Sequence, residues 1–491
     1  MCRQRPFKKI ITNVLILLTI ICAPAVGNAQ AEPPVPPVLS LQEAILLALR
    51  YNPDVQNEEI QRIADKFALR VAQNAYELQY ALLGSANISS FRVAGDSETI
   101  HSADLSPAVG LQGVYGTEYG LEMNNVATNG NYNPGVNATI IQPLIRGFGK
   151  EVTLAPLEIA EVTELISRLT LKKTLMQTVA NVISNYNSLV QSQNDVEIAR
   201  LSLQSYKSTI DLDNALIKAG RKAPTEVLQA QAQYASREVD LQNSENTVQS
   251  NMLSLMNTLG LSPDIKFSIT KELPVEKFKN FDFDDCYAIA AQNNIELLVT
   301  KLNLKTAKKQ LLLAEDGARV QLDLTLSAAT GNGVGADFNS GFASLTNNKN
   351  SELSAGLTLA VPIDNYALKQ SVLDAKLLVK KSKINVETAE RVLKSTIMND
   401  INNINSQQKK IELGKAALEL QQQNQDYLLA KLKYGLTSTF EVTTTQQDLD
   451  KARLTLIQSK IGYLNAVTQL YAHMGVLLEK WEIQIKNTRR S

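Results

Sequence analysis

Proline is absent from two long segments of this chain, residues 157–223 and 363–491. Proline breaks or kinks the interior of a helix, so a long segment without it is free to stay helical. Residues 157–219 also lack glycine, and at 1.5 Å per residue they allow about 95 Å of continuous helix. The sequence therefore predicts very long helices, which extend far beyond the width of an ordinary globular domain.

The apolar residues of these segments form narrow seams. In the first segment they recur at alternating spacings of three and four, at residues 176, 179, 183, 186 and 190. In the second segment they recur at residues 386, 389, 393, 397, 401 and 404. Such a seam favours coiled-coil packing of antiparallel helices. The remaining surface is rich in Asn, Gln, Ser and Thr, which suits either a solvated hairpin or a helix that lines a water-filled lumen.

Residues 1–29 have the composition of a secretory signal peptide. Arg3, Arg5, Lys8 and Lys9 precede an apolar segment over residues 10–22, and small residues up to Ala29 follow it. Lipidation of Cys22 is a competing interpretation, disfavoured because the bulky Ile21 precedes that cysteine. We therefore expect an exported chain.

Composition excludes several functional classes. The full sequence has 49 basic and 49 acidic residues, so removing the four cations of the signal leaves a net charge of −4. This balance lacks the basic excess of a nucleic-acid-binding protein. The two histidines and three cysteines are not clustered, and no phosphate-binding loop is present. We expect no metal site, no cofactor and no enzymatic activity.

The chain contains a repeated pattern. Residues 39–90 align with residues 281–332, and residues 214–260 align with residues 429–475, without internal gaps. Chance similarity between helical segments is the alternative, but the conserved order of the aligned blocks favours a tandem duplication. We expect a proline-rich linker over 30–38, a first repeat over 39–260, a connector over 261–280, a second repeat over 281–475 and a tail over 476–491.

Each repeat has the same predicted order of elements. Short helices come first, with a capping-box pattern at Ser40 and Glu43 and a helix boundary at Asn52-Pro53. Strands follow, over about 84–142 and about 324–362, and helical hairpins over 144–260 and 363–475 complete the repeats. Residues 94–132 have no counterpart of equal length in the second repeat, which leaves an extracellular loop or an extra hairpin open.

The two helical hairpins reverse at tips over residues 219–227 and 434–442. Gly220 and Gly435 stand where a glycine commonly follows a helix end. Glu226 and Glu441 fall in the first turn of the returning helices, and Ser438 forms a capping-box pattern with Glu441. Helix capping and a ring of negative charge at a pore entrance are compatible interpretations of the two glutamates.

These features together resemble the family of TolC-type outer-membrane efflux proteins. The resemblance rests on the signal, the duplication, the opening helix over 39–52, and the Gln142-Pro143-Leu144-Ile145-Arg146-Gly147-Phe148-Gly149 segment. The segment from Gly220 through Thr225-Glu226-Val227 and the helix end Leu259-Gly260 add to it. It covers residues 39–475.

The resemblance implies a mostly helical fold with a β-barrel portion. Three copies would form a homotrimer. Each protomer would contribute four strands to a twelve-stranded barrel in the Gram-negative outer membrane. The long coiled-coil helices would form a periplasmic α-barrel.

The resemblance also implies a function and partners. The chain would conduct efflux or type I secretion cargo, in contact with outer-membrane lipid, a periplasmic adaptor and an inner-membrane pump. Glu226 and Glu441 are the gate candidates, and the adaptor-docking candidates are Gly220, Arg221, Lys222, Tyr434, Gly435, Leu436 and Thr437. A soluble periplasmic coiled-coil adaptor or structural protein is the alternative.

Overall fold

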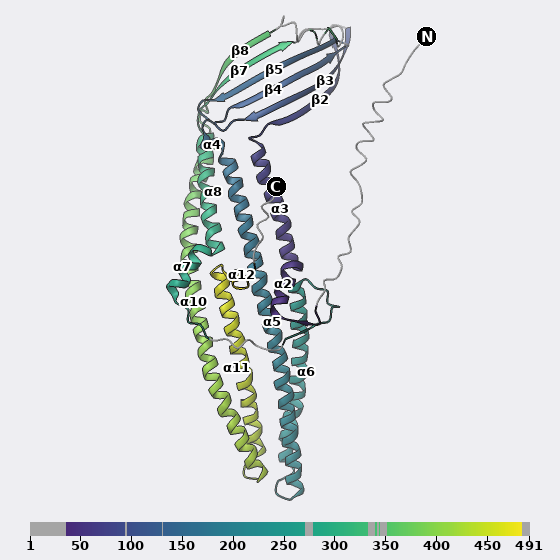
Figure 1. Ribbon diagram of the computed structural model, residues 1–491, viewed down its shortest axis with the longest axis vertical. Coiled ribbons are helices and arrows are strands. Elements are labelled where there is room, and N and C mark those ends of the chain that lie inside the picture. The colour runs from purple at the N-terminus through teal and green to yellow at the C-terminus, as the bar shows by residue number, and fades with distance from the viewer. Residues whose placement is uncertain are drawn as a thin grey trace, which may run out of the picture.

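The computed structural model describes residues 36–93, 96–129, 131–270, 278–331, 339–340, 343 and 351–483. The molecule is elongated, with a curved sheet at one end and helices that extend to two tips at the other (Figure 1). The expected signal peptide and Cys22 lie outside the described residues.

Four long helices form the body of the molecule. They are α5 (Ala155–Lys218), α6 (Glu226–Leu259), α10 (Tyr366–Lys433) and α11 (Thr439–His473). The predicted long helices are therefore confirmed. The seam residues Met176, Val179, Ile183, Tyr186 and Val190 are all buried, as are Leu393, Ile397, Ile401 and Ile404 of α10. No helix in the described part of the chain is long and apolar enough to cross a membrane.

Shorter helices lie between the middle of the body and the sheet (Figure 1). They are α2 (Leu41–Tyr51), α3 (Pro53–Asn74), α4 (Lys150–Thr153), α7 (Phe283–Asn293), α8 (Ile295–Gly317) and α12 (Leu477–Lys480). Both hydrogen bonds of the Ser40–Glu43 capping box are present, and α3 begins at Pro53 as predicted. A short parallel pair, β1 (Val38–Leu39) and β6 (Ser268–Ile269), joins the start of the first repeat to the connector that follows it.

The same junction occurs once in each half of the chain. The Asn52 side chain caps α3 and donates to the Thr258 carbonyl oxygen over 2.8 Å, and Asn294 caps α8 and donates to the His473 carbonyl oxygen over 2.8 Å. Gly260 and Gly475 follow the helix that carries each acceptor. A Cβ atom at either glycine would lie 2.2 Å from a backbone carbonyl oxygen, so both close approaches require glycine.

The sheet has six antiparallel strands in the order β2-β3-β4-β5-β7-β8. The strands are β2 (Gln79–Val93), β3 (Asp96–Gln112), β4 (Glu118–Thr128), β5 (Asn131–Pro143), β7 (Gln321–Gly331) and β8 (Ser351–Ala360). The expectation of four strands per chain is wrong for this sheet, because β3 and β4 add a hairpin within residues 96–128 of the described chain. The strands also begin before the expected 84 and 324, because α3 and α8 end at Asn74 and Gly317.

Candidate functional site

The two tips have the same backbone geometry. After α5, Gly220 has φ +70°, and the Arg221 amide donates to the Leu216 carbonyl oxygen over 2.9 Å. After α10, Gly435 has φ +73°, and the Leu436 amide donates to the Lys431 carbonyl oxygen over 3.0 Å. This pattern is the Schellman motif, which ends a helix with a left-handed residue. Both predicted glycine positions are therefore helix C-caps.

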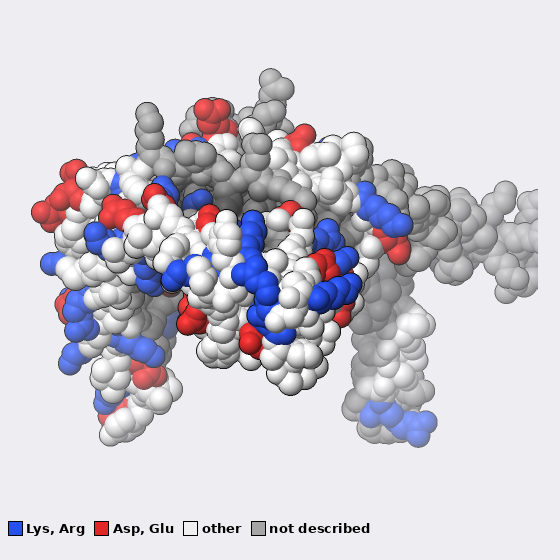
Figure 2. All heavy atoms as spheres, turned by 90° about the horizontal axis from the view of Figure 1, so that it is seen from below, with Lys and Arg blue, Asp and Glu red and all other residues white. Residues whose placement is uncertain are grey.

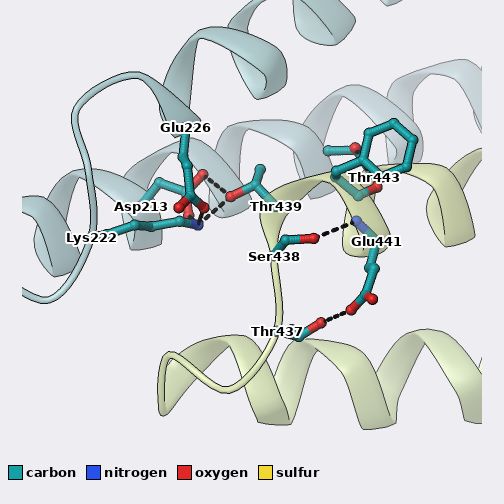
Figure 3. A network of polar contacts seen from close by, with 9 residues as sticks. Asp213, Lys222, Glu226, Thr437, Ser438, Thr439, Glu441 and Thr443 are labelled. Carbon is teal, nitrogen blue, oxygen red and sulfur yellow. Dashed lines mark hydrogen bonds and ion pairs between the residues drawn. The ribbon is translucent and has the colours of Figure 1, made fainter.

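Glu441 lies in the first turn of α11, and its backbone is capped by Ser438. The Ser438 hydroxyl accepts a hydrogen bond from the Glu441 amide over 3.2 Å. The Glu441 carboxylate accepts from the Thr437 hydroxyl, where the capping-box pattern predicts the Ser438 amide as donor (Figure 3). Only one half of the predicted capping box is formed, and the exposed Glu441 side chain is held at the second tip.

Glu226 is the first residue of α6, and no side-chain hydrogen bond caps this helix at Thr225. The Glu226 carboxylate lies 3.5 Å from the Lys222 ammonium, and its side chain is 43% exposed. A carboxylate in the first turn is favoured by the helix dipole. The two glutamates therefore occupy different positions, one beside a cation and one beside a hydroxyl.

Lys222 links the two tips from a buried position. Its ammonium pairs with the Asp213 carboxylate of α5 and donates to the Thr439 hydroxyl of α11. The Thr439 hydroxyl in turn donates to Asp213 over 2.8 Å (Figure 3). The exposed fractions of the Lys222 and Asp213 side chains are 6% and 0%. A buried ion pair of this kind becomes strongly destabilising when one partner is removed.

Further contacts between α5 and α11 continue this link away from the tips. The hydroxyl groups of Ser202 and Ser205 donate to Asp450 over 2.6 Å and to Gln446 over 2.8 Å. Burial raises the pKa of Asp450, although hydrogen bonds from Ser202 and Gln446 act in the opposite direction. The two hairpins thus share a row of polar contacts between α5 and α11.

The outer surface of the second tip is apolar and exposed. Tyr434 and Leu436 are 67% and 70% exposed, and Phe440 is also exposed. Arg221 is exposed as well, and its guanidinium donates to the Tyr434 carbonyl oxygen over 2.9 Å. Seen from the tip end, basic and acidic side chains are interspersed with uncharged ones (Figure 2).

Sequence reasoning missed three of these residues. Asp213, Thr439 and Phe440 were not among the candidates, although Thr439 and Phe440 stand within the predicted tip. The contact of Asp213 with Thr439 gives no local signal, because Thr439 is brought to it only by the packing of α5 against α11. Its ion-pair partner Lys222 lies only nine residues further along the chain. Among the described residues, no three His, Cys, Asp or Glu side chains are grouped to hold a metal ion.

Comparison with known proteins identifies the family. The sequence profile described as outer membrane efflux protein matches twice, over residues 45–261 and 286–476. The chain belongs to the outer membrane efflux protein family. The recognition drawn from the sequence is thereby confirmed, and the efflux protein is assigned to the outer membrane.

Relatives and solved structures agree with this assignment. The efflux protein is 23% identical to the outer membrane protein TolC of Escherichia coli K12 over 316 residues, which are 63% of either chain. Its fold resembles the CmeC outer membrane channel of Campylobacter jejuni, with a TM-score of 0.70 and 13% identity. The match covers 91% of this chain and 90% of the CmeC chain. It also resembles the open MtrE outer membrane channel of Neisseria gonorrhoeae, with a TM-score of 0.67, 15% identity, and coverage of 91% of each chain.

Proposed function

We propose that this efflux protein is a passive outer-membrane channel that conducts efflux or type I secretion cargo and is opened by its partners. The observation that carries the proposal is the joining of an open-edged antiparallel sheet to long helical hairpins in one elongated chain (Figure 1). The sheet would cross the membrane and the helices would extend into the periplasm. Family membership supports this assignment, since members are efflux channels rather than enzymes.

The edges of the sheet support the proposal of an oligomer. Among the described strands, β2 and β8 each have a neighbour on one side only. In lipid every backbone amide and carbonyl group must be hydrogen-bonded, so an open sheet edge is not tolerated. Pairing of β2 with β8 of the next copy closes the sheet, and we propose three copies as in the family that the sequence resembles.

The gate is proposed at the tips. Glu226 and Glu441 have exposed side chains at the end of the molecule far from the sheet, where three copies would form a ring of six carboxylates. The contacts of Lys222 with Asp213 and Thr439 hold the two tips of a chain together. In the proposal, opening requires these contacts to be rearranged.

The adaptor and its inner-membrane pump are proposed as partners, with docking at the outer surface of the tips. Tyr434, Gly435 and Leu436 of the second tip supply an exposed contact area beside the half-buried Thr437. Gly220 and Arg221 extend it to the first tip. Lys222 is the exception among the docking candidates. Its ammonium is engaged inside the chain, so we propose that it positions the tips.

Single-channel recording tests the gate assignment. In a lipid bilayer under a KCl gradient, Glu441→Gln should lower the preference for potassium over chloride. Glu412→Gln is a matched control, because its carboxylate lies 3.2 Å from the Lys409 ammonium of the same helix and is already compensated. Unchanged selectivity in Glu441→Gln would remove Glu441 from the gate.

Membrane fractionation separates the channel from its alternative. A soluble periplasmic adaptor would be recovered in the periplasmic fraction after osmotic release. The proposed channel should remain with the outer membrane after washing at high salt. Recovery in the soluble fraction alone would overturn the channel proposal.

A further inference from the structure

The hairpin formed by β3 and β4 has the side-chain alternation of a membrane strand. Neighbouring residues in register across the sheet form an apolar row on one face, with one residue from each strand: Tyr80, Val109, Leu121, Ala138, Ala328 and Leu353. The residues one position away form a polar row on the opposite face: Gln79, Gly110, Gly120, Thr139, Ser327 and Ser354. The hairpin therefore continues both faces of the sheet without interruption.

The apolar face is exposed in the single chain. Tyr80 is 77% exposed, Leu353 is 86% exposed, and Leu105 of β3 and Leu121 of β4 are both exposed. An exposed apolar area that crosses six strands requires a cover. In an outer-membrane protein whose strands alternate between apolar and polar faces, lipid hydrocarbon covers the apolar face.

The polar face carries the acidic residues of the sheet. In the register, Glu98, Asp104, Glu118, Glu122, Asp323 and Glu352 all fall on this face. No lysine or arginine of the described strands shares it, since Arg92 falls on the apolar side of β2 near its far end. Four of these six carboxylates belong to β3 and β4, so the hairpin makes the polar face more acidic.

The hairpin also holds β2 in the sheet. Within the described part of the chain, strand β2 pairs only with β3, over fifteen residues, and β4 pairs with β5 over eleven. If β3 and β4 formed a loop outside the membrane, β2 would lose its bonded neighbour within the chain. The strands are also long enough, because a tilted strand crosses a bilayer with about 9–11 residues, and β4 has 11.

We propose that β3 and β4 are part of the membrane wall, so that each chain contributes six strands. This inference rests on the proposed trimeric channel. Three copies then form an eighteen-stranded barrel rather than the twelve-stranded barrel expected from the resemblance. Barrel diameter grows roughly linearly with strand number, so this barrel is about 1.5-fold wider. Its lumen carries twelve additional carboxylates from the three hairpins and favours cationic cargo.

Cysteine accessibility tests the placement of the hairpin. The variants are Val109→Cys and Leu121→Cys for the apolar face and Ala108→Cys and Glu122→Cys for the polar face, each in a Cys286→Ser background. The purified chain is reconstituted in liposomes and treated with a charged, membrane-impermeant maleimide. We expect the polar-face cysteines to react at least tenfold faster than the apolar-face cysteines.

A pair on β7 serves as the control, because this strand belongs to the wall in either arrangement. Ser327→Cys should react fast and Ala328→Cys slowly. If the β7 pair differs while the cysteines of β3 and β4 all react fast, the hairpin lies outside the membrane and the inference is overturned. If the two β7 cysteines also react at equal rates with the maleimide, the proposed membrane channel itself fails, and the inference fails with it.

A second measurement keeps the test independent of cysteine variants that fold poorly. Removing two polar-face charges of β4 with Glu118→Gln and Glu122→Gln should lower the permeability ratio of potassium to chloride at least twofold in single-channel recordings. Unchanged selectivity in a channel of unchanged conductance would show that these carboxylates do not line the lumen, and would overturn the assignment.

Discussion

The Arg221 guanidinium donates a hydrogen bond of 2.9 Å to the Tyr434 carbonyl oxygen and joins the first tip to the second at the surface. Beneath this exposed contact, the buried Lys222 pairs with Asp213 and contacts Thr439. The two cations are neighbours in sequence but differ in burial. They should therefore differ in their effect on the gate.

Lys222→Met should open the tips. The substitution leaves the Asp213 carboxylate buried without its cation, which costs about 3–5 kcal/mol when a buried pair is broken. We expect longer open times in single-channel recordings and a lower temperature of unfolding in detergent. Arg221→Ala should change both quantities much less, because exposed ionic contacts contribute about 0–1 kcal/mol.

A double variant separates charge from packing at this position. Lys222→Met combined with Asp213→Leu removes both buried charges and should recover most of the lost stability. Equal open times for the wild type and Lys222→Met would contradict the role of Lys222 between the tips.

Gly260→Ala should destabilise the chain more than Gly220→Ala. Both glycines have φ near +70°, where an L-residue costs about 1–2 kcal/mol. At Gly260 a Cβ atom would also lie 2.2 Å from the Tyr51 carbonyl oxygen, whereas no atom lies within 4 Å of one at Gly220. Measured by circular dichroism, the unfolding temperature of Gly260→Ala should be clearly lower than that of Gly220→Ala. Equal unfolding temperatures would contradict the close approach of Gly260 to the Tyr51 carbonyl oxygen.

Asn52→Ala should weaken the junction between α2, α3 and α6. The substitution removes the cap of α3, worth about 0.5–2 kcal/mol, and the hydrogen bond to the Thr258 carbonyl oxygen. Asn52→Asp keeps the capping acceptor but loses the donor to Thr258. We expect its unfolding temperature to lie between those of the wild type and Asn52→Ala. An Asn52→Asp variant as unstable as Asn52→Ala would show that the cap contributes nothing.

Asp450 should make stability depend on pH. Burial raises its pKa above the ordinary aspartate value, so the folded chain binds this proton more readily than the unfolded chain does. The contribution of Asp450 to stability therefore falls as pH rises from the unfolded pKa through the raised folded pKa. The side chain of Asp450→Asn cannot titrate. The unfolding temperature of this variant minus that of the wild type should therefore increase as pH rises above about 4. Parallel pH profiles would contradict the raised pKa.

Local sequence patterns predicted the helical part of this fold well. The absence of proline from residues 157–223 and 363–491, and of glycine from residues 157–219, indicated the long helices α5 and α10. The capping box at Ser40 and the glycines at the tips indicated helix ends. These features depend on residues close together in the chain. They can be read from sequence because a helix is stabilised by contacts three and four residues apart.

The number of strands and the contacts between the tips could not be predicted in the same way. Strands β3 and β4 lie within the predicted strand segment over 84–142, but their Gly, Asn and Ser residues also suit a loop, so an extracellular loop and an extra hairpin both stayed open. Pairing with β2 and β5 identifies them as strands of the same sheet. Asp213 and Thr439 are separated by 226 positions and meet only when α5 packs against α11.

The most direct test of the channel is electrical. Purified, folded chain is added to a planar lipid bilayer under a KCl gradient, and the current and reversal potential are recorded. The account predicts discrete conductance steps and a reversal potential that shows preference for potassium over chloride. A folded preparation that produces no steps, or a channel that prefers chloride, would contradict it.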